Sequence, residues 1–345
     1  MVKRNFSPEC YYNLKAQKHR PVYHFTGKTP DEWRAWYSEA YDTYKKILGD
    51  FPVSVPLNPV VESVDDLGDI IRERVIIDAE ENMSVPCYVL HSKDMPCDKS
   101  GAAIICSHGH GKFGKEPVAG VRTTPGMIHD IEEMNYNYGE KMARAGFLTI
   151  CPDLRGFGER SDGDDPLGMT RDMCNINFLK GALFGSYPLT QNIFDITRCI
   201  DYLETRPEVN KERIGMMGLS QGGTMTTFAS AFDKRIKAAD IICYVTYFAG
   251  FAVRDTNFCG SQMIPNVYKY FDASDIAGLI APRPLLIERG LKDRCFVCED
   301  TTRGFTEVEK IYEAAGCREL LWSDVGDVGH AFCDNRAYEF FKKYL

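Results

Sequence analysis

The pattern of hydrophobic residues changes at about residue 74. Before that point one stretch stands out: over residues 30–48, Trp and Tyr side chains recur at helical spacing after Thr29-Pro30-Asp31-Glu32. A Thr N-cap, a Pro at the first helical position and a Glu three residues after the Thr are signals of a helix start. We therefore predict a helical N-terminal extension over residues 1–73, whose aromatic helix packs on the main domain or contacts another copy of the chain.

From residue 74 to 345, short apolar and β-branched runs alternate with segments of helical period. This alternation predicts an α/β fold with a doubly wound, mostly parallel sheet and helices on both faces. The first two strands follow each other closely, which indicates an antiparallel start. The predicted strands cover residues 74–78, 85–91, 102–106, 147–151, 213–217, 238–244, 284–289 and 319–323, and the predicted helices after the extension cover 132–145, 190–205, 221–232, 304–316 and 334–344.

Two stretches of this catalytic domain, residues 156–190 and 245–282, are too long to be simple connections between a strand and a helix. Long segments of this kind often form walls or lids over a site. Active sites of doubly wound sheets lie at the carboxyl ends of the strands. We therefore expect both insertions to border the active site.

Composition and charge narrow the class of protein. The 345 residues include 41 Lys plus Arg and 49 Asp plus Glu, so the net charge is 41 − 49 = −8, and no basic block occurs. Nucleic acid is therefore not an expected partner, and the apolar runs are too short for a membrane span. The thirteen Cys are scattered, many inside apolar runs, and no apolar leader follows the N-terminal basic residues. These features favour reduced thiols and a cytoplasmic location.

The strongest chemical signal is Gly218-Leu219-Ser220-Gln221-Gly222, which follows a predicted strand and precedes a predicted helix. A G-x-S-x-G in this context is typical of a nucleophile on a sharp strand-to-helix turn. Glycines are needed there because larger side chains would collide with neighbouring backbone. We predict that Ser220 is a nucleophile and that the amide of Gln221 stabilises the oxyanion of an acyl-transfer reaction.

A serine nucleophile needs a base, and His330 is the only His after Ser220. It lies beyond the last predicted strand, where the base of this chain order belongs. For the acid we choose Asp293, in the loop after the strand at 284–289. The remaining candidates for the acid are Glu288, Asp324 and Asp327.

The second oxyanion donor should come from the loop after the strand at 102–106, and we assign it to the amide of His110. The alternative is that His108 and His110 bind a metal. No third ligand with recognisable spacing accompanies them, so we expect no metal and no cofactor. Cys295 and Cys298 form a single C-x-x-C, which cannot by itself complete a zinc site.

Arg155 and Phe157 follow the strand at 147–151. Arg155 is interpreted as a member of an Arg–Asp pair at the rim of the site, and direct contact of both residues with substrate is the alternative.

Four blocks of sequence resemble the α/β-hydrolase superfamily, and within it the dienelactone-hydrolase-like group that includes acetyl xylan esterases and cephalosporin C deacetylases. The blocks are HGHGKFGKEPVAG at 108–120, PDLRGFGER at 152–160, FDITRCIDYLETRPEVNKERIGMMGLSQGG at 194–223, and DIAGLIAPRPLLIERGLKD at 275–293. The resemblance implies Ser220, Asp293 and His330 as a catalytic triad, with the amides of Gln221 and His110 as oxyanion hole.

We therefore expect a serine carboxylic ester hydrolase that acts on a small-molecule ester through an acyl-enzyme. A serine peptidase of the prolyl-oligopeptidase type and a non-catalytic receptor on the same fold are the alternatives. Polar residues of the 156–190 insertion favour a short acyl group, such as acetyl, on a polar or sugar-like alcohol. These residues are Arg160, Asp162, Asp164, Asp165, Arg171, Asp172, Asn175 and Asn177.

Overall fold

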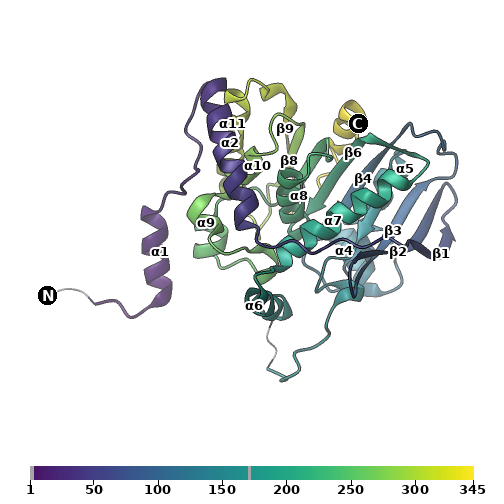
Figure 1. Ribbon diagram of the computed structural model, residues 1–345, viewed down its shortest axis with the longest axis horizontal. Coiled ribbons are helices and arrows are strands. Elements are labelled where there is room, and N and C mark those ends of the chain that lie inside the picture. Colours follow the sequence, from purple (N-terminus) through teal and green to yellow (C-terminus); the bar gives the residue numbers. More distant parts are fainter. Residues whose placement is uncertain (1–3, 170–171) are drawn as a thin grey trace.

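The centre of the protein is a single, mostly parallel sheet. The computed structural model describes residues 4–169 and 172–345. Within these residues, nine strands form one sheet in the order β1-β2-β3-β5-β4-β6-β7-β8-β9 (Figure 1). Strands β1, β2, β3 and β5 pair antiparallel, and β5, β4 and β6 to β9 pair parallel. The predicted α/β fold with an antiparallel start is confirmed.

The elements have the following bounds. The strands are β1 (Val60–Asp66), β2 (Ile70–Glu80), β3 (Met83–Ser92), β4 (Gly101–Ser107), β5 (Leu148–Pro152), β6 (Val209–Leu219), β7 (Ala238–Ile242), β8 (Leu285–Gly290) and β9 (Leu321–Gly326). The α-helices are α1 (Pro8–Lys18), α2 (Pro30–Ile47), α3 (Lys115–Val118), α4 (Pro125–Met134), α5 (Tyr138–Arg144), α6 (Met173–Phe184), α7 (Pro188–Thr205), α8 (Gln221–Phe232), α9 (Val267–Tyr270), α10 (Ala273–Gly278), α11 (Cys298–Ala314) and α12 (Ala337–Tyr344). Short 3-10 segments include η1 (Gly158–Arg160) and η3 (Gly260–Gln262).

Both faces of the sheet are covered, and strand β4 shows how its sequence achieves this. Successive side chains of a strand point to opposite faces. Ala103 and Ile105 join the apolar cluster that includes α7, α8 and α11, whereas Ile104 and Cys106 join the cluster that includes α5 and α12. All four side chains are buried, so β4 lies between two layers of helices.

The aromatic N-terminal helix α2 packs on the main domain. Tyr44 is fully buried, and its hydroxyl donates a hydrogen bond to the carbonyl of Phe228 in α8 over 2.6 Å. The hydroxyl of Tyr41 likewise donates to the carbonyl of Phe232 at the end of α8. Helix α1 differs, because none of its side chains is buried, and it lies apart from the sheet in Figure 1.

Several elements differ from the sequence-based prediction. Helices α1 and α6, the short helices α3, α9 and α10, and strand β1 were not predicted, and β1 lies inside the range assigned to the helical extension although it pairs with β2. The helix predicted over 132–145 is wrong: α4 ends where Asn135 adopts a left-handed conformation, with φ of 52°, and α5 starts afresh. Helix α11 begins six residues earlier than predicted, at Cys298 rather than 304.

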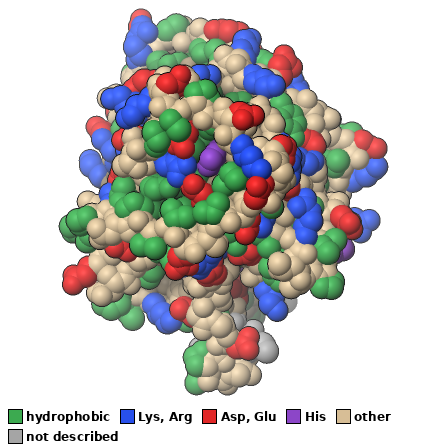
Figure 2. All heavy atoms as spheres, turned by 90° about the vertical axis from the view of Figure 1, so that its right-hand side faces the viewer, with side chains coloured by type: hydrophobic (Ala, Val, Ile, Leu, Met, Phe, Trp, Pro, Cys, Tyr) green, Lys and Arg blue, Asp and Glu red, His purple; other side chains and the backbone are tan. Residues whose placement is uncertain are grey.

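The surface carries charges of both signs. Figure 2 shows basic and acidic side chains interspersed over one face of the molecule. Within the described part of the chain, no helix has both the length and the apolar composition that a membrane span needs.

Candidate active site

Ser220 lies on a sharp turn between β6 and α8. Its backbone has φ of 63° and ψ of −114°, a conformation that L-residues rarely adopt. A side chain at Gly222 would overlap the carbonyl oxygen of Ser107 in β4, and one at Gly218 would meet the backbone of Gly222. Both glycines of the motif are therefore required by close approach of the backbone, as the sequence pattern predicted.

His330 and Asp293 form a hydrogen-bonded pair. The Nδ1 of His330 lies 2.8 Å from Oδ2 of Asp293, whose side chain is only 1% exposed. The other oxygen, Oδ1, accepts hydrogen bonds from the backbone N–H groups of Cys295 and Phe296. Burial raises the pKa of Asp293, but the bonds from His330 and the two amides outweigh burial, so the pKa lies below its ordinary value. Asp293 is thus an ionised carboxylate that keeps a proton on Nδ1 of His330.

One cavity brings the predicted nucleophile and base together. It has a volume of about 360 Å³ and is lined by His110, Ser220 and His330, with polar and aromatic side chains around them. The ring of Phe296 stacks on the ring of His330 at 5.7 Å between centroids. No hydrogen bond joins Ser220 to His330 in the described structure, and catalytic hydrogen bonds often tighten only when substrate binds. The remaining lining residues are Asp172, Thr256, Asn257, Phe258, Cys259, Gln262, Cys295 and Phe296.

The predicted oxyanion donors flank the serine. Gln221 is the first residue of α8, so its N–H has no acceptor within the helix and is free to bind an oxyanion. Its side-chain amide donates to the carbonyl of Ser261, away from this role. His110 lies in the loop after β4 and lines the same cavity as Ser220.

The other candidate acids are engaged elsewhere. Glu288 is buried and accepts a hydrogen bond from the backbone of Cys333. Asp324 accepts one from the side chain of Asn335, and exposed Asp327 forms an ion pair with Lys292. Asp293 is therefore the acid that contacts His330.

Arg155 and Phe157 do not line this cavity. Arg155 binds Asp195 through two nitrogens, at 2.8 and 2.7 Å, and Glu80 through a third. Its guanidinium is thus engaged in ion pairs, which fits the structural interpretation of Arg155, and contact with substrate stays a prediction. Phe157 is buried, and its ring packs edge-on against His110 at 5.0 Å.

His108 does not share a metal ligand position with His110. Its Nε2 accepts a hydrogen bond from the N–H of Leu154 at 3.0 Å, which requires the proton to be on Nδ1, where it is donated to the carbonyl of Gly109. Burial lowers the pKa of His108, so the ring is neutral. Both ring nitrogens are therefore used to hold the loop after β4.

Two cysteines that the sequence analysis did not connect with the site lie beside His110. They are Cys174, in the first turn of α6, and Cys259, just before η3. The contact with Cys174, together with those of His110 and Ser261, lowers the pKa of Cys259 to about 5, and the contact with Cys259 raises the pKa of His110. No spacing in the sequence signals this cluster, since its members come from three distant segments.

Cys295 and Cys298, the C-x-x-C pair of the sequence, are both free thiols.

The sheet topology, the strand-to-helix turn at Ser220 and the His330–Asp293 pair define an α/β-hydrolase. A family model described as the Abhydrolase family matches residues 4–305, and the chain belongs to this family. Among curated proteins, this chain is similar to YtaP of Bacillus subtilis (strain 168), whose name describes it as a candidate hydrolase. The two are 26% identical over 87% of this chain and 97% of YtaP.

Solved structures with similar folds include two esterases. A glucuronoyl esterase from Solibacter usitatus matches 92% of this chain and 97% of its own with a TM-score of 0.64 and 16% identity. An acetyl xylan esterase from Paenibacillus sp. R4 matches 98% of this chain and 100% of its own with a TM-score of 0.58 and 19% identity. At these identities the likeness is one of fold, and it agrees with the predicted relationship.

Proposed function

We propose that the protein hydrolyses carboxylic esters through an acyl-enzyme on Ser220. The observation that carries this proposal is the placement of Ser220, on a positive-φ turn, in one cavity with a His330 that is held by buried Asp293. A nucleophile, a base and an orienting acid in this order are the parts that acyl transfer requires.

The two half-reactions follow from these positions. His330 takes the proton of Ser220 through Nε2 while Oγ attacks the carbonyl carbon of the ester, and then gives the proton to the departing alcohol. Water, deprotonated by the same nitrogen, attacks the acyl carbon; the bond from that carbon to Oγ then breaks, and His330 returns the proton to Ser220 as the carboxylic acid leaves. The amides of Gln221 and His110 stabilise the negative oxygen in both steps.

The cavity lining supports a short acyl group on a polar alcohol. Asp172, Thr256, Asn257 and Gln262 make this wall polar, although each already has a hydrogen-bond partner within the protein, and a polar wall suits a polar alcohol better than an alkyl chain. Of the insertion residues that motivated this prediction, Asp172 lines the cavity, whereas Arg160 is buried in an ion pair with Asp195. Arg171 lies outside the described residues. The other polar side chains of the cavity wall, Thr256, Asn257 and Gln262, belong to the second insertion.

Labelling with a fluorophosphonate tests the nucleophile. We expect one label per chain, located at Ser220 by peptide mass spectrometry, and no label in Ser220→Ala. Ser107→Ala is the control variant. Ser107 is buried at the end of the neighbouring strand β4, so this variant should still be labelled at Ser220. Labelling at any other residue, or full activity of Ser220→Ala, would contradict the proposal.

A substrate panel tests the ester and alcohol. We expect kcat/KM to fall from nitrophenyl acetate to butyrate to octanoate, acetylated sugars to be deacetylated, and the matching anilides to react far more slowly. A preference for octanoate would overturn the short-acyl part and leave the nucleophile intact. A preference for anilides would make the protein an amidase with the same catalytic groups.

A further inference from the structure

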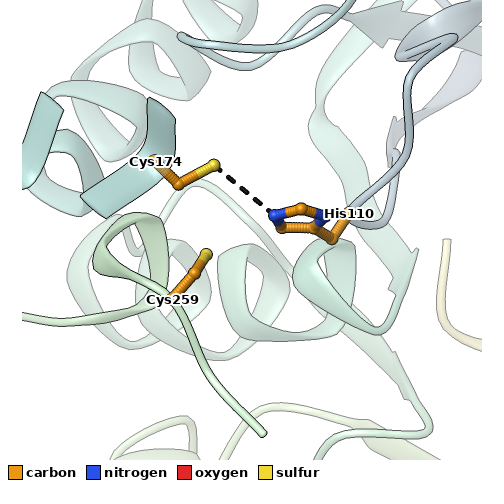
Figure 3. Close-up of side chains that lie close together, drawn as sticks. All are labelled: His110, Cys174 and Cys259. Atoms are coloured by element: carbon orange, nitrogen blue, oxygen red, sulfur yellow. Dashed lines mark hydrogen bonds between the residues drawn. The ribbon is translucent and has the colours of Figure 1, made fainter. Parts of the chain in front are cut away.

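His110, Cys174 and Cys259 point at one another from three separate segments. His110 belongs to the loop after β4, Cys174 to the first turn of α6 and Cys259 to the segment before η3 (Figure 3). The Nε2 of His110 lies 3.5 Å from Sγ of Cys174, and the three ligand atoms all lie within 4.8 Å of one another. The cluster therefore presents one nitrogen and two sulfurs to a common point.

The separation between the ligand atoms of His110 and Cys174 fits a tetrahedral ion. Zinc binds sulfur at about 2.3 Å and imidazole nitrogen at about 2.0 Å, so a tetrahedral angle places the two atoms about 3.5 Å apart. The separation between His110 and Cys174 is 3.5 Å. Two thiolates and one imidazole are also a ligand set that zinc uses when the fourth position is left to water or substrate.

We propose that His110, Cys174 and Cys259 bind one zinc ion, or another divalent ion of similar preference, with the fourth coordination position open. The site uses the side chain of His110, and the backbone amide of the same residue keeps its separate place as a proposed oxyanion donor. His110 and Cys259 line the cavity that contains Ser220, so an ion has a path to the site from that cavity.

Neighbouring groups already hold the ligands. The ring of Phe157 packs edge-on against His110 at 5.0 Å, with 80° between the ring planes, which fixes the orientation of the imidazole. The hydroxyl of Ser261 lies 2.7 Å from Sγ of Cys259, where it can donate to a thiolate. Outer contacts of this kind orient and tune metal ligands.

An ion at this position would join three parts of the active-site wall. Cys174 lies in the first long insertion and Cys259 in the second, whereas His110 belongs to the loop that carries a proposed oxyanion donor. Binding would hold both insertions against that loop. Binding of an ion at this site does not depend on ester hydrolysis, because it requires only the three ligand side chains.

Cobalt(II) provides a direct test, because tetrahedral cobalt thiolates have visible d–d bands and a sulfur-to-metal charge-transfer band. The full-length protein, kept reduced and stripped with a chelator, is titrated with cobalt. We expect these bands to saturate at one ion per chain and to disappear when zinc is added. Cys174→Ser and Cys259→Ser should each lose most of the charge-transfer intensity, and His110→Ala should bind at least tenfold more weakly.

Cys295→Ser and Cys298→Ser are control variants, since Cys295 lines the cavity and neither thiol belongs to the cluster, and they should keep the full spectrum. Circular dichroism and thermal melts of each variant identify any that fail to fold; His110→Ala, whose side chain is exposed, provides the test if a buried cysteine variant does not. The proposal is overturned if wild-type protein gives no tetrahedral thiolate spectrum, or if the spectrum survives in the Cys174→Ser/Cys259→Ser double variant. Neither outcome bears on the labelling of Ser220.

Discussion

Ser220 shows how function sets the conformation of a single residue. A non-glycine residue with positive φ outside the common regions costs on the order of 1–3 kcal/mol, and Ser220, with φ of 63°, has a Cβ that bears this cost. The backbone is held there because its N–H donates to the carbonyl of Ile242 and its carbonyl accepts from the N–H of Thr224. The turn therefore keeps the hydroxyl exposed to the cavity at the expense of stability.

This strain predicts a difference between two inactive variants. Ser220→Ala keeps the Cβ and the strain, whereas Ser220→Gly removes both. We expect Ser220→Gly to be more stable than Ser220→Ala by about 1 kcal/mol, measured by urea unfolding, even though glycine usually destabilises. Ala35→Gly, at an exposed position inside α2, should show the usual loss. A Ser220→Gly variant less stable than Ser220→Ala would show that the turn is unstrained.

Asp293 should support catalysis by keeping the proton of His330 on Nδ1. In Asp293→Asn the amide would present an N–H or a weak acceptor to Nδ1, so Nε2 would no longer be kept free to accept the serine proton. We expect kcat to fall by about 10²–10⁴-fold with an unchanged circular dichroism spectrum. Asp327→Asn, on an exposed carboxylate paired with Lys292, is the control and should leave kcat unchanged. An unaltered rate in Asp293→Asn would remove this residue from the proposed triad.

At the scale of elements, a buried lysine joins the loop after β4, which carries His110, to the loop after β5. Lys115 in α3 is fully buried, and its Nζ lies 2.8 Å from Oδ2 of Asp153, just after β5, with Glu159 of η1 as a further partner. The backbone N–H of Lys115 donates to Oδ1 of the same Asp153. The loop after β4, which carries His110, and the loop after β5 are thereby held together by charge-assisted bonds rather than by an apolar contact.

Replacing this lysine should destabilise the protein strongly. Lys115→Met would leave the buried carboxylate of Asp153 without its counter-ion, a change that typically costs about 3–5 kcal/mol. Chemical denaturation would measure the loss. Lys112→Met, three residues earlier and exposed, should change stability by less than about 0.5 kcal/mol. A loss of similar size in both variants would argue against a special role for the buried pair.

The elements that sequence could not predict are those that lack a periodic apolar signal. The strands of the central sheet and helix α8 were predicted because their burial follows the sequence pattern. Helix α1 buries no side chain, and the side chains of edge strand β1 are exposed or half-exposed, so neither shows an apolar face. The turn at Ser220 has a local motif, but the neighbourhood of His110, Cys174 and Cys259 is created only by tertiary contacts between distant loops.

At the scale of the whole molecule, the core of the sheet contains carboxylic acids. Asp240 on β7, Glu288 on β8 and Asp324 on β9 are buried on adjacent strands. Burial raises the pKa of Glu288 to about 8, and the nearby charge of Asp324 adds to this effect. Burial likewise raises the pKa of Asp240, with Glu288 as the next cause. Near neutral pH the folded protein therefore holds protons that the unfolded chain has released.

Global stability should consequently fall as the pH rises. The pKa of an unfolded Glu is about 4.3, so between about pH 5 and pH 8 the folded state binds more protons at Glu288 than the unfolded state does. The free energy of unfolding therefore falls across this window. Glu288→Gln, which keeps an acceptor for the N–H of Cys333, should remove part of this fall. We expect the variant to match wild type at pH 5 and to be more stable by at least about 1.4 kcal/mol, the equivalent of one pKa unit, at pH 8.5. Urea unfolding at both pH values measures this, with Asp327→Asn as the exposed control; a gain of equal size at both pH values would mean that Glu288 titrates normally.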